Sequence, residues 1–286
     1  MGFRENLKEV LKGDLIEDEL SLLPRGFQAI GKVMIIKLKS KLLGKKKIIG
    51  KACLELIPYI KSVYVNLGKI TGTFREPESI ELIAGEDNPI VEHKEHGIFY
   101  RFDIKKIVFS KGNITERKHL ATLVKPGEAI VDMFAGIGYF SLPIAKHSQV
   151  DKIYSIELNP VSYQFLVENI KLNHLEEKII PIMGNCKEEV LKLSKKGIIA
   201  DRVIMGIFPA PKEFIKEALT LAKDHGTIFH YEGVVVKERY MDLFNEFNEI
   251  ASMNSFTCNL LTHRFVKSYG PHLYHVVLDI KTSRNE

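Results

Sequence analysis

A strand that ends in an acid and then turns through two glycines is the feature that most restricts how this chain can fold. The apolar run over residues 129–131 leads into Asp132, and Gly136 and Gly138 follow before the next predicted helix. Because glycine has no Cβ, backbone N–H groups in such a turn can approach a ligand, and the following helix directs its positive end at the same point. The pattern is typical of a nucleotide-binding site, but alone it does not identify the nucleotide.

Strands and helices are predicted to alternate from residue 128 onward. The strand-like runs cover residues 129–132, 152–157, 179–183, 200–205 and 226–231. Helices are predicted over residues 159–172, 212–222 and 237–251. This order favours a mostly parallel sheet with right-handed crossovers, and Pro181 places the third run near a strand end or a sheet edge.

The end of the chain breaks this alternation. Residues 257–267 and 273–281 are strand-like and are joined by a short turn without a helix, which predicts an antiparallel hairpin on the sheet edge. A mostly parallel seven-stranded sheet closed by such a hairpin resembles the class I, Rossmann-like α/β fold of S-adenosylmethionine-dependent transferases. A dehydrogenase fits less well, because Ser141 stands where the dinucleotide fingerprint has its last glycine or alanine.

The first part of the chain has a different character. Residues 33–38, 62–65, 80–85 and 97–102 are strand-like, and the apolar spacing over residues 45–60 allows a helix. We therefore expect a small α+β domain over residues 1–105 and a donor-binding catalytic domain over residues 106–286. Seven lysines crowd one segment of the smaller domain, where they could contact a nucleic-acid backbone or form a solvated face: Lys37, Lys39, Lys41, Lys45, Lys46, Lys47 and Lys51.

Composition excludes several classes of protein. No apolar run reaches the roughly 18 residues that a membrane span needs, and the polar start has no signal-peptide character. We therefore expect a cytoplasmic protein with no membrane partner. The three cysteines, Cys53, Cys186 and Cys258, lie far apart and predict neither a metal-binding clip nor a disulfide framework, so no metal is expected.

Polar residues follow the first three strands of the predicted parallel sheet. Asp132 ends the first strand, where it could orient the turn or reach the methionine ammonium of the donor. Glu157 ends the second strand and could accept hydrogen bonds from both ribose hydroxyls, a geometry that serves NAD equally well. Asn185 and Cys186 follow the third strand, where such folds contact the adenine. The carboxyl ends of parallel strands meet at one edge, so we expect these residues to lie together.

Four segments resemble a single family of tRNA-modifying enzymes. They are residues 23–27, 109–117, 132–140 and 201–209, so the resemblance covers nearly the whole chain. The family contains the tRNA guanine-N1 methyltransferases and the wybutosine-pathway aminocarboxypropyltransferases. It implies S-adenosylmethionine as the group donor and tRNA as the acceptor.

Two positions distinguish the branches of that family. The methyltransferases carry a proline-arginine pair in the second of these segments and an asparagine after the methionine of the fourth strand. This chain has Gly112-Asn113 and Gly206 instead, a pattern similar to the aminocarboxypropyl branch. That branch transfers the 3-amino-3-carboxypropyl group to C7 of 4-demethylwyosine beside the anticodon of tRNA(Phe) and releases methylthioadenosine. Glycine at position 206 would leave room for the donor to bind with its methionine arm turned toward the acceptor.

The resemblance also implies which residues bind the donor. Arg117 would pair with the methionine carboxylate, and Asn185-Cys186 departs from the aspartate-asparagine pair usual in the family, so its contact with adenine would lose its charge. The implied donor-binding residues are Ser110, Arg117, Asp132, Phe134, Ala135, Gly136, Gly138, Glu157, Asn185 and Cys186.

No residue is identified as an indispensable base. Gly206 and His230 are candidates for positioning groups, although a structural hydrogen bond would equally explain His230 at a strand end. Phe208 and Tyr139 could stack on an acceptor base or belong to the core. Two alternative functions stay open: a tRNA guanine-N1 methyltransferase, and a non-catalytic RNA-binding protein with a degenerate donor pocket.

Overall fold

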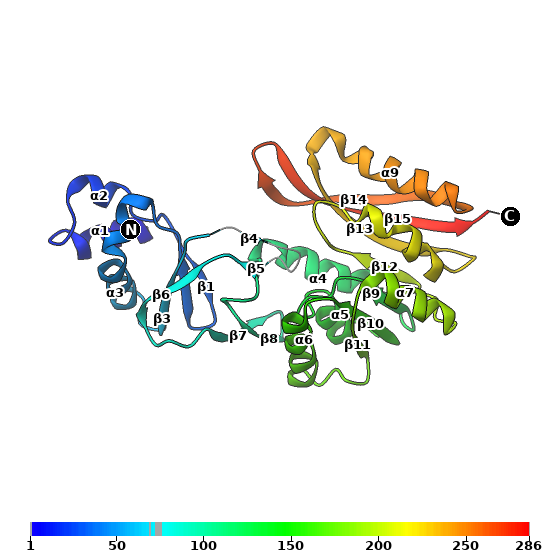
Figure 1. The fold of residues 1–286 in the computed structure, drawn as a ribbon, viewed down its shortest axis with the longest axis horizontal. Coiled ribbons are helices and arrows are strands. Elements are labelled where there is room, and N and C mark those ends of the chain that lie inside the picture. Colours follow the sequence, from blue (N-terminus) through cyan, green and yellow to red (C-terminus); the bar gives the residue numbers. More distant parts are fainter. Residues whose placement is uncertain (1, 69, 72–75, 286) are drawn as a thin grey trace. The chain divides into compact units, whose positions relative to one another are not determined.

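The chain forms two compact units in the computed structural model, which describes residues 2–68, 70–71 and 76–285 (Figure 1). The first unit comprises Met1–Glu95 and Phe99–Phe109, and the second comprises His96–Ile98 and Ser110–Glu286. The expected domain boundary after residue 105 lies close to the change of unit after Phe109. As a functional division it stays a prediction.

A four-stranded sheet in the order β1-β2-β3-β6 forms the centre of the first unit. Side chains of α1 and α3, among them Leu7 and Ile49, pack with Met34 and Val63 of the sheet in one apolar core. The elements are α1 (Phe3–Leu11), α2 (Glu17–Ser21), β1 (Gln28–Ile30), β2 (Val33–Ile36), the 3-10 helix η1 (Ser40–Lys45), α3 (Lys46–Leu56), β3 (Ser62–Asn66), β4 (Ile70–Thr71), β5 (Glu76–Pro77), β6 (Ile80–Gly85), β7 (Ile90–Glu95) and β8 (Ile98–Asp103).

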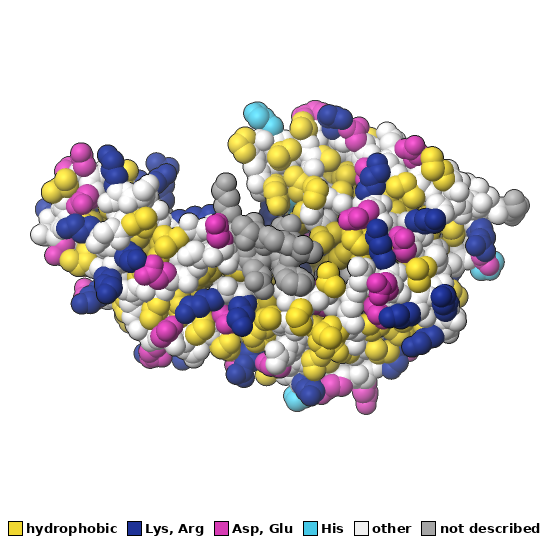
Figure 2. Space-filling view, in the orientation of Figure 1, with side chains coloured by type: hydrophobic (Ala, Val, Ile, Leu, Met, Phe, Trp, Pro, Cys, Tyr) yellow, Lys and Arg dark blue, Asp and Glu magenta, His cyan; other side chains and the backbone are white. Residues whose placement is uncertain are grey.

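These elements confirm the α+β character expected of this part of the chain. The predicted strands correspond to β2, β3, β6 and β8, and the helix allowed over residues 45–60 is α3. The sequence reading missed α1 and α2. Of the lysine-rich segment, Lys46 forms an ion pair with Glu81 at 2.8 Å, and its other six lysines are exposed. On the face drawn in Figure 2, Lys and Arg side chains are interspersed with Asp and Glu.

The second unit is built on a seven-stranded sheet in the order β11-β10-β9-β12-β13-β15-β14. Neighbouring strands from β11 to β13 are parallel, and β15 pairs antiparallel with both β13 and β14. The elements are the 3-10 helix η2 (Lys111–Asn113), α4 (Ile114–Leu123), β9 (Ala129–Asp132), α5 (Ser141–His147), β10 (Lys152–Glu157), α6 (Pro160–Leu172), β11 (Ile179–Met183), α7 (Cys186–Lys195), β12 (Arg202–Met205), η3 (Lys212–Phe214), α8 (Ile215–Ala218), η4 (Leu219–Leu221), β13 (Thr227–Val236), η5 (Lys237–Arg239), α9 (Tyr240–Met253), β14 (Phe256–Gly270) and β15 (Leu273–Arg284).

This topology confirms the predicted α/β fold: a mostly parallel sheet closed by an antiparallel C-terminal hairpin. β11 is the edge strand, which explains why it tolerates Pro181. Asn159 begins α6 as predicted, because its side-chain oxygen accepts the Val161 N–H at 2.9 Å and Pro160 occupies the first turn.

One predicted helix differs. The segment 212–222 is divided into η3, α8 and η4 rather than forming one α-helix. Leu219 and Leu221 are both buried, and the Leu221 carbonyl accepts the Ala200 N–H at 2.8 Å, so the end of the segment is bound to the chain entering β12. In a helix ending at residue 222 this carbonyl would have no intrahelical partner, and the Ala200 N–H supplies one. The helices α4 and α7 were not predicted.

The core of the second unit lies between the sheet and α7, α8 and α9. Val190, Ile215 and Phe247 from these helices pack against inward-facing residues such as Val131 and Phe229. The helices α4, α5 and α6 lie on the other side of the sheet (Figure 1). The carboxyl ends of β9, β10, β11, β12 and β13 therefore meet at one edge between two helical layers, which is where open α/β sheets bind ligands.

Candidate donor and acceptor site

The glycine turn after β9 is held rigidly by its two neighbouring strands. The Met133 N–H donates to the Ile204 carbonyl of β12 at 3.1 Å, and the Ala135 N–H donates to the Ile156 carbonyl of β10 at 2.9 Å. Gly136 has a φ of +57°. A Cβ built there would stand 2.5 Å from Cε2 of Tyr139, so the Tyr139 ring lies directly against this glycine. The position therefore requires glycine both for its backbone conformation and for space.

Glu157, at the end of β10, binds the same turn. Its Oε2 accepts the Gly136 N–H at 2.7 Å, and its Oε1 accepts the Asn159 N–H at 2.7 Å. Burial raises the pKa of the carboxyl above its usual range, although these backbone hydrogen bonds oppose the shift. Each oxygen keeps a second lone pair, so the carboxylate can still accept hydrogen bonds from a ribose.

Asp132 is the deepest acid of the site and is 1% exposed. Its Oδ2 accepts the Ser141 hydroxyl at 2.7 Å, and Ser141 accepts in turn from Ser155 at 2.7 Å. Burial raises the pKa of the Asp132 carboxyl to about 7; the bonds from Ser141 and the Phe134 N–H oppose this shift, and the neighbouring carboxylates Glu157 and Glu232 add to it. A cation bound beside this cluster of acids would be strongly favoured.

Asn185 and Cys186 begin α7, and their side chains serve the helix. The Asn185 Oδ1 accepts the Lys187 N–H at 3.0 Å as an N-cap. Cys186 is 6% exposed and packs in the core, where burial raises the pKa of its thiol to about 12. The donor could therefore contact only backbone groups here and the hydrogen-bonding groups of the Asn185 amide that the cap does not use. That contact stays a prediction.

Ser110 and Arg117 lie together at the start of α4. The buried Arg117 guanidinium donates to the Ser110 carbonyl at 3.0 Å, and Nζ of Lys267 donates to the Ser110 hydroxyl at 2.7 Å. Lys267 comes from β14, far away in the sequence, and sequence reasoning missed it. A Cβ at Gly112 would stand 2.7 Å from Cδ of Lys267, so the glycine gives this lysine its path to Ser110.

Gly206 follows β12 at the same edge of the sheet. A Cβ there would stand 3.2 Å from Cε2 of Phe140 and 3.3 Å from Oε1 of Glu232. Its backbone is not in the left-handed region, so only the crowding by Phe140 and Glu232 disfavours a side chain here. That Gly206 leaves room beside the acceptor stays a prediction.

His230 belongs to a buried network of charged groups. Its Nε2 accepts from the Arg202 guanidinium at 2.8 Å, which leaves the proton on Nδ1, donated to Asp279 at 2.5 Å. Burial lowers the pKa of His230 despite the neighbouring Asp279. Arg264 binds Asp279 and also Glu116 of α4 at 2.8 Å. Both ring nitrogens of His230 are thus engaged in holding the sheet to the hairpin, which favours a structural role over proton transfer.

A second buried pair lies two residues further along β13 and was missed. Glu232 Oε2 accepts from His275 Nε2 at 2.8 Å, and the two side chains are 3% and 0% exposed. The Phe208 ring packs edge-on against His275, with ring centroids 4.7 Å apart, and against Tyr269 at 5.6 Å. Glu232 lies just after the predicted strand 226–231, and His275 lies in the predicted run 273–281, so neither position by itself indicated that the two are partners.

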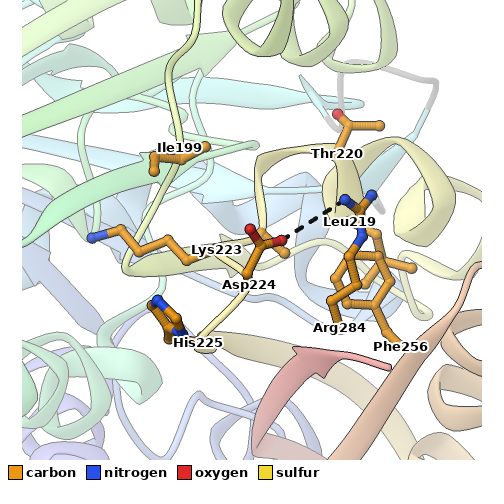
Figure 3. Close-up of a pocket in the computed structure, with 9 residues that line it drawn as sticks. Ile199, Leu219, Thr220, Lys223, Asp224, His225, Phe256 and Arg284 are labelled. Carbon is orange, nitrogen blue, oxygen red and sulfur yellow. Dashed lines mark ion pairs between the residues drawn. The ribbon is translucent and has the colours of Figure 1, made fainter. Parts of the chain in front are cut away.

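A cavity of about 530 Å³ lies at the opposite end of the sheet (Figure 3). It is lined by residues that precede β13, including Lys223 and Asp224, and by Phe256 and Arg284 of the hairpin; Asp224 and Arg284 form a 3.8 Å ion pair there. Because the glycine turn follows the carboxyl end of β9, this cavity is separate from the site described above.

Membrane-spanning helices and metal-binding clusters are both absent from the described ranges 2–68, 70–71 and 76–285. Within them, no helix is long and apolar enough to cross a membrane. No group of three or more His, Cys, Asp or Glu side chains in those ranges could hold a metal ion.

Comparison with known proteins gives matches along nearly the whole chain. Residues 91–261 match the family described as the TRM5/TYW2 methyltransferase domain, and residues 7–88 match the TYW2 N-terminal domain. A Pyrococcus horikoshii protein named tRNA(Phe) (4-demethylwyosine(37)-C(7)) aminocarboxypropyltransferase is 36% identical over 286 residues, which is 99% of each chain. The tRNA 4-demethylwyosine(37)-methyltransferase Taw21 of Saccharolobus solfataricus is 33% identical over 82% of this chain and 85% of its own.

A solved structure shows the same fold with a ligand. The crystal structure of P. horikoshii TYW2 in complex with MeSAdo has a TM-score of 0.82 and 33% identity, and the match covers 98% of this chain and 99% of that one.

Proposed function

Because the chain belongs to the TRM5/TYW2 family, we propose that it is an S-adenosylmethionine-dependent tRNA aminocarboxypropyltransferase. It transfers the 3-amino-3-carboxypropyl group to C7 of 4-demethylwyosine in tRNA(Phe) and releases methylthioadenosine. The observation that carries this proposal is the 36% identity to an enzyme of that name over 99% of both chains, N-terminal domain included.

The donor fits the residues at the carboxyl ends of the strands. When bound, it supplies an electrophilic carbon attached to a positively charged sulfur. We use the name donor cradle for the glycine turn over residues 133–138 together with Glu157. Gly136 has no Cβ, and the Tyr139 ring occupies that space, while Glu157 keeps lone pairs for the ribose. Burial and the neighbouring acids raise the pKa of Asp132 to about 7, and the positively charged donor would stabilise its carboxylate form when bound. We propose that Phe134, Ala135 and Gly138 complete this cradle.

The choice of the transferred carbon rests on the surroundings of the cradle. Gly112 gives Lys267 access to Ser110, beside the Arg117 guanidinium. We propose that these basic groups bind the donor's carboxylate and hold the methionine arm toward the acceptor. We propose that the absence of a side chain at Gly206 leaves room beside the acceptor. Which of the three sulfonium carbons is transferred then depends on which carbon–sulfur bond is aligned with the attacking atom of the acceptor.

We also propose how the tRNA is held. The anticodon region is the expected contact, because a loop base can be splayed out and inserted at modest cost. The six exposed lysines between Lys37 and Lys51 are the candidate backbone contacts in the N-terminal domain. A cytoplasmic location is proposed because the acceptor is tRNA.

Methyl transfer to the same base is the second candidate, because Taw21, a methyltransferase by name, is 33% identical. One experiment separates the two. The protein is incubated with tRNA carrying 4-demethylwyosine and with donor labelled in either the methyl or the carboxypropyl carbon. We expect methylthioadenosine and a base labelled only from the carboxypropyl donor. Adenosylhomocysteine with a methyl-labelled base would establish the second candidate, and absence of any transfer would leave the RNA-binding alternative.

Gly206→Asn tests the positioning proposal. The added side chain meets Phe140 and Glu232, so we expect carboxypropyl transfer to fall while donor affinity changes less. Gly197→Asn, a substitution at a glycine with a φ of +78° and open space around it, is the control for a general loss of folding. Full carboxypropyl transfer in the Gly206 variant would remove this glycine from the account of donor pose.

A further inference from the structure

The buried pair of Glu232 and His275 has no assigned role in the transfer, although the charge of Glu232 acts on Asp132. Glu232 lies on β13 opposite Val277 of β15, and His275 lies opposite Val234, so the two side chains share one face of the sheet. Glu232 is 2% exposed and His275 is fully buried. An acid and an imidazole placed here cost free energy through desolvation, which their mutual 2.8 Å hydrogen bond offsets only in part.

Each member of the pair keeps one polar atom that is not used. Among the described residues, Glu232 Oε1 receives no hydrogen bond, and His275 Nδ1 is buried without a partner. Buried polar atoms in native proteins are nearly always satisfied, so the buried His275 Nδ1 and the unbonded oxygen of Glu232 beside it point to a group that is bound during function. Glu232 Oε1 lies 3.3 Å from the point where a Cβ of residue 206 would stand.

Two observations place Glu232 near both the glycine turn and the loop after β12. On one side is the glycine turn, since the charge of Glu232 acts on Asp132 and is one of the causes, after burial, of its raised pKa. On the other side is Phe208, whose ring packs on His275 and belongs to the loop after β12. The Val234 N–H donates to the Pro209 carbonyl at 2.9 Å, which fixes this loop beside β13. A base stacked on Phe208 would therefore lie near Glu232.

We propose that Glu232 is the proton acceptor of the reaction and that His275 positions its carboxylate; this rests on the proposed function. C7 of the acceptor forms a bond to the carboxypropyl carbon as the bond from that carbon to sulfur breaks, and the electron pair stays on sulfur. C7 then carries both the new substituent and its hydrogen. The C–H electron pair returns to the ring, and the proton passes to Glu232 Oε1 and later to solvent.

The proposed role of Glu232 gives a second reason for glycine at position 206. A side chain at position 206 would stand in the gap that Glu232 Oε1 borders, so it would separate the carboxylate from the acceptor. Glycine at 206 and an acid at 232 therefore act as a unit. Removing a proton from carbon needs such a base close to C7, whereas Glu157 and Asp132 already accept hydrogen bonds from Gly136 and Ser141.

Glu232→Gln tests the proposal, because glutamine keeps the shape and can still accept from His275. We expect kcat to fall by about 100-fold or more, with the donor Kd within a few-fold of wild type. The decisive measurement compares kcat for a substrate deuterated at C7 with kcat for the ordinary substrate. A primary isotope effect should appear or become larger in the variant, because proton removal becomes slow. Glu246→Gln is the matched control, because Glu246 binds the neighbouring Tyr231 hydroxyl but lies on α9.

Glu232→Ala provides an independent reading. Added formate should restore part of its activity, and restoration should increase with formate concentration. The proposal is overturned by unchanged kcat in the glutamine variant, by no isotope effect in a slow variant, or by loss of donor binding with kcat intact, which would make Glu232 a donor anchor. Failure of the wild-type protein to form methylthioadenosine would instead overturn the proposed function.

Discussion

Neutralising Asp132 should stabilise the protein in a way that depends on pH. The carboxyl is 1% exposed, and its pKa is raised from 3.8 to about 7, mainly by burial. The folded state therefore holds the proton more tightly than the unfolded chain. The stability contributed by that proton is fully present below about pH 4 and is lost as the pH rises through about 7. The shift of roughly 3 pKa units corresponds to about 4 kcal/mol at 1.36 kcal/mol per unit.

Asp132→Asn removes this ionisation while keeping polar atoms that can bond to Ser141 and the Phe134 N–H. We expect the difference in the free energy of unfolding, variant minus wild type, to grow by up to about 4 kcal/mol between about pH 4 and pH 8. Urea unfolding followed by far-UV circular dichroism at a series of pH values measures it. Asp151→Asn, at an exposed aspartate of the same unit, is the control.

A difference that stays constant over that range would refute the reasoning, because it would mean that Asp132 has the same proton affinity in the folded and unfolded states. The same variant should bind the cationic donor more weakly at pH 8. If donor affinity were unaffected, Asp132 would be a structural acid of the turn.

The remaining predictions concern four other places in the chain. Gly138→Ala should destabilise the protein by about 1–3 kcal/mol, measured by urea unfolding, since its φ is +96° and a Cβ would stand 2.6 Å from the Leu142 side chain. Arg264→Met should cost about 3–5 kcal/mol in the same assay, because two buried carboxylates lose their shared partner. Replacing exposed Lys39 and Lys47 by Gln should reduce the slope of log tRNA affinity against log salt by about 0.7 for each lost phosphate contact, and an unchanged slope would exclude them as contacts. Asn185→Asp, which keeps the cap of α7, should not weaken donor binding.

Local patterns were enough to predict much of the fold. The apolar run before Asp132, the glycines after it and the Asn159-Pro160 start of a helix all act through neighbours in the sequence, and each corresponds to the observed β9, turn and α6. The division of the segment 212–222 into η3, α8 and η4 was not predicted, and its end is bound by the Ala200 N–H from a distant segment.

The site was only partly visible in the sequence. The first three strand ends could be found because parallel strands place their carboxyl ends at one edge. Lys267 could not, because it reaches Ser110 from the hairpin across 157 positions of sequence, through the space left by Gly112. The pair of Glu232 and His275 was also missed, since the strand register that joins them is set by long-range pairing.

The sequence by itself determined the order of strands and helices, the glycine turn and the acids at the strand ends, because these depend on backbone preferences and hydrophobic period. Only the tertiary structure decided which charged side chains are partners. His230 is hydrogen-bonded between Arg202 and Asp279, and one oxygen of Glu232 lies beside Gly206 without a hydrogen bond. The reason is physical: a buried charge is stabilised or exposed to a ligand by groups that packing brings near, and those come from distant parts of the chain.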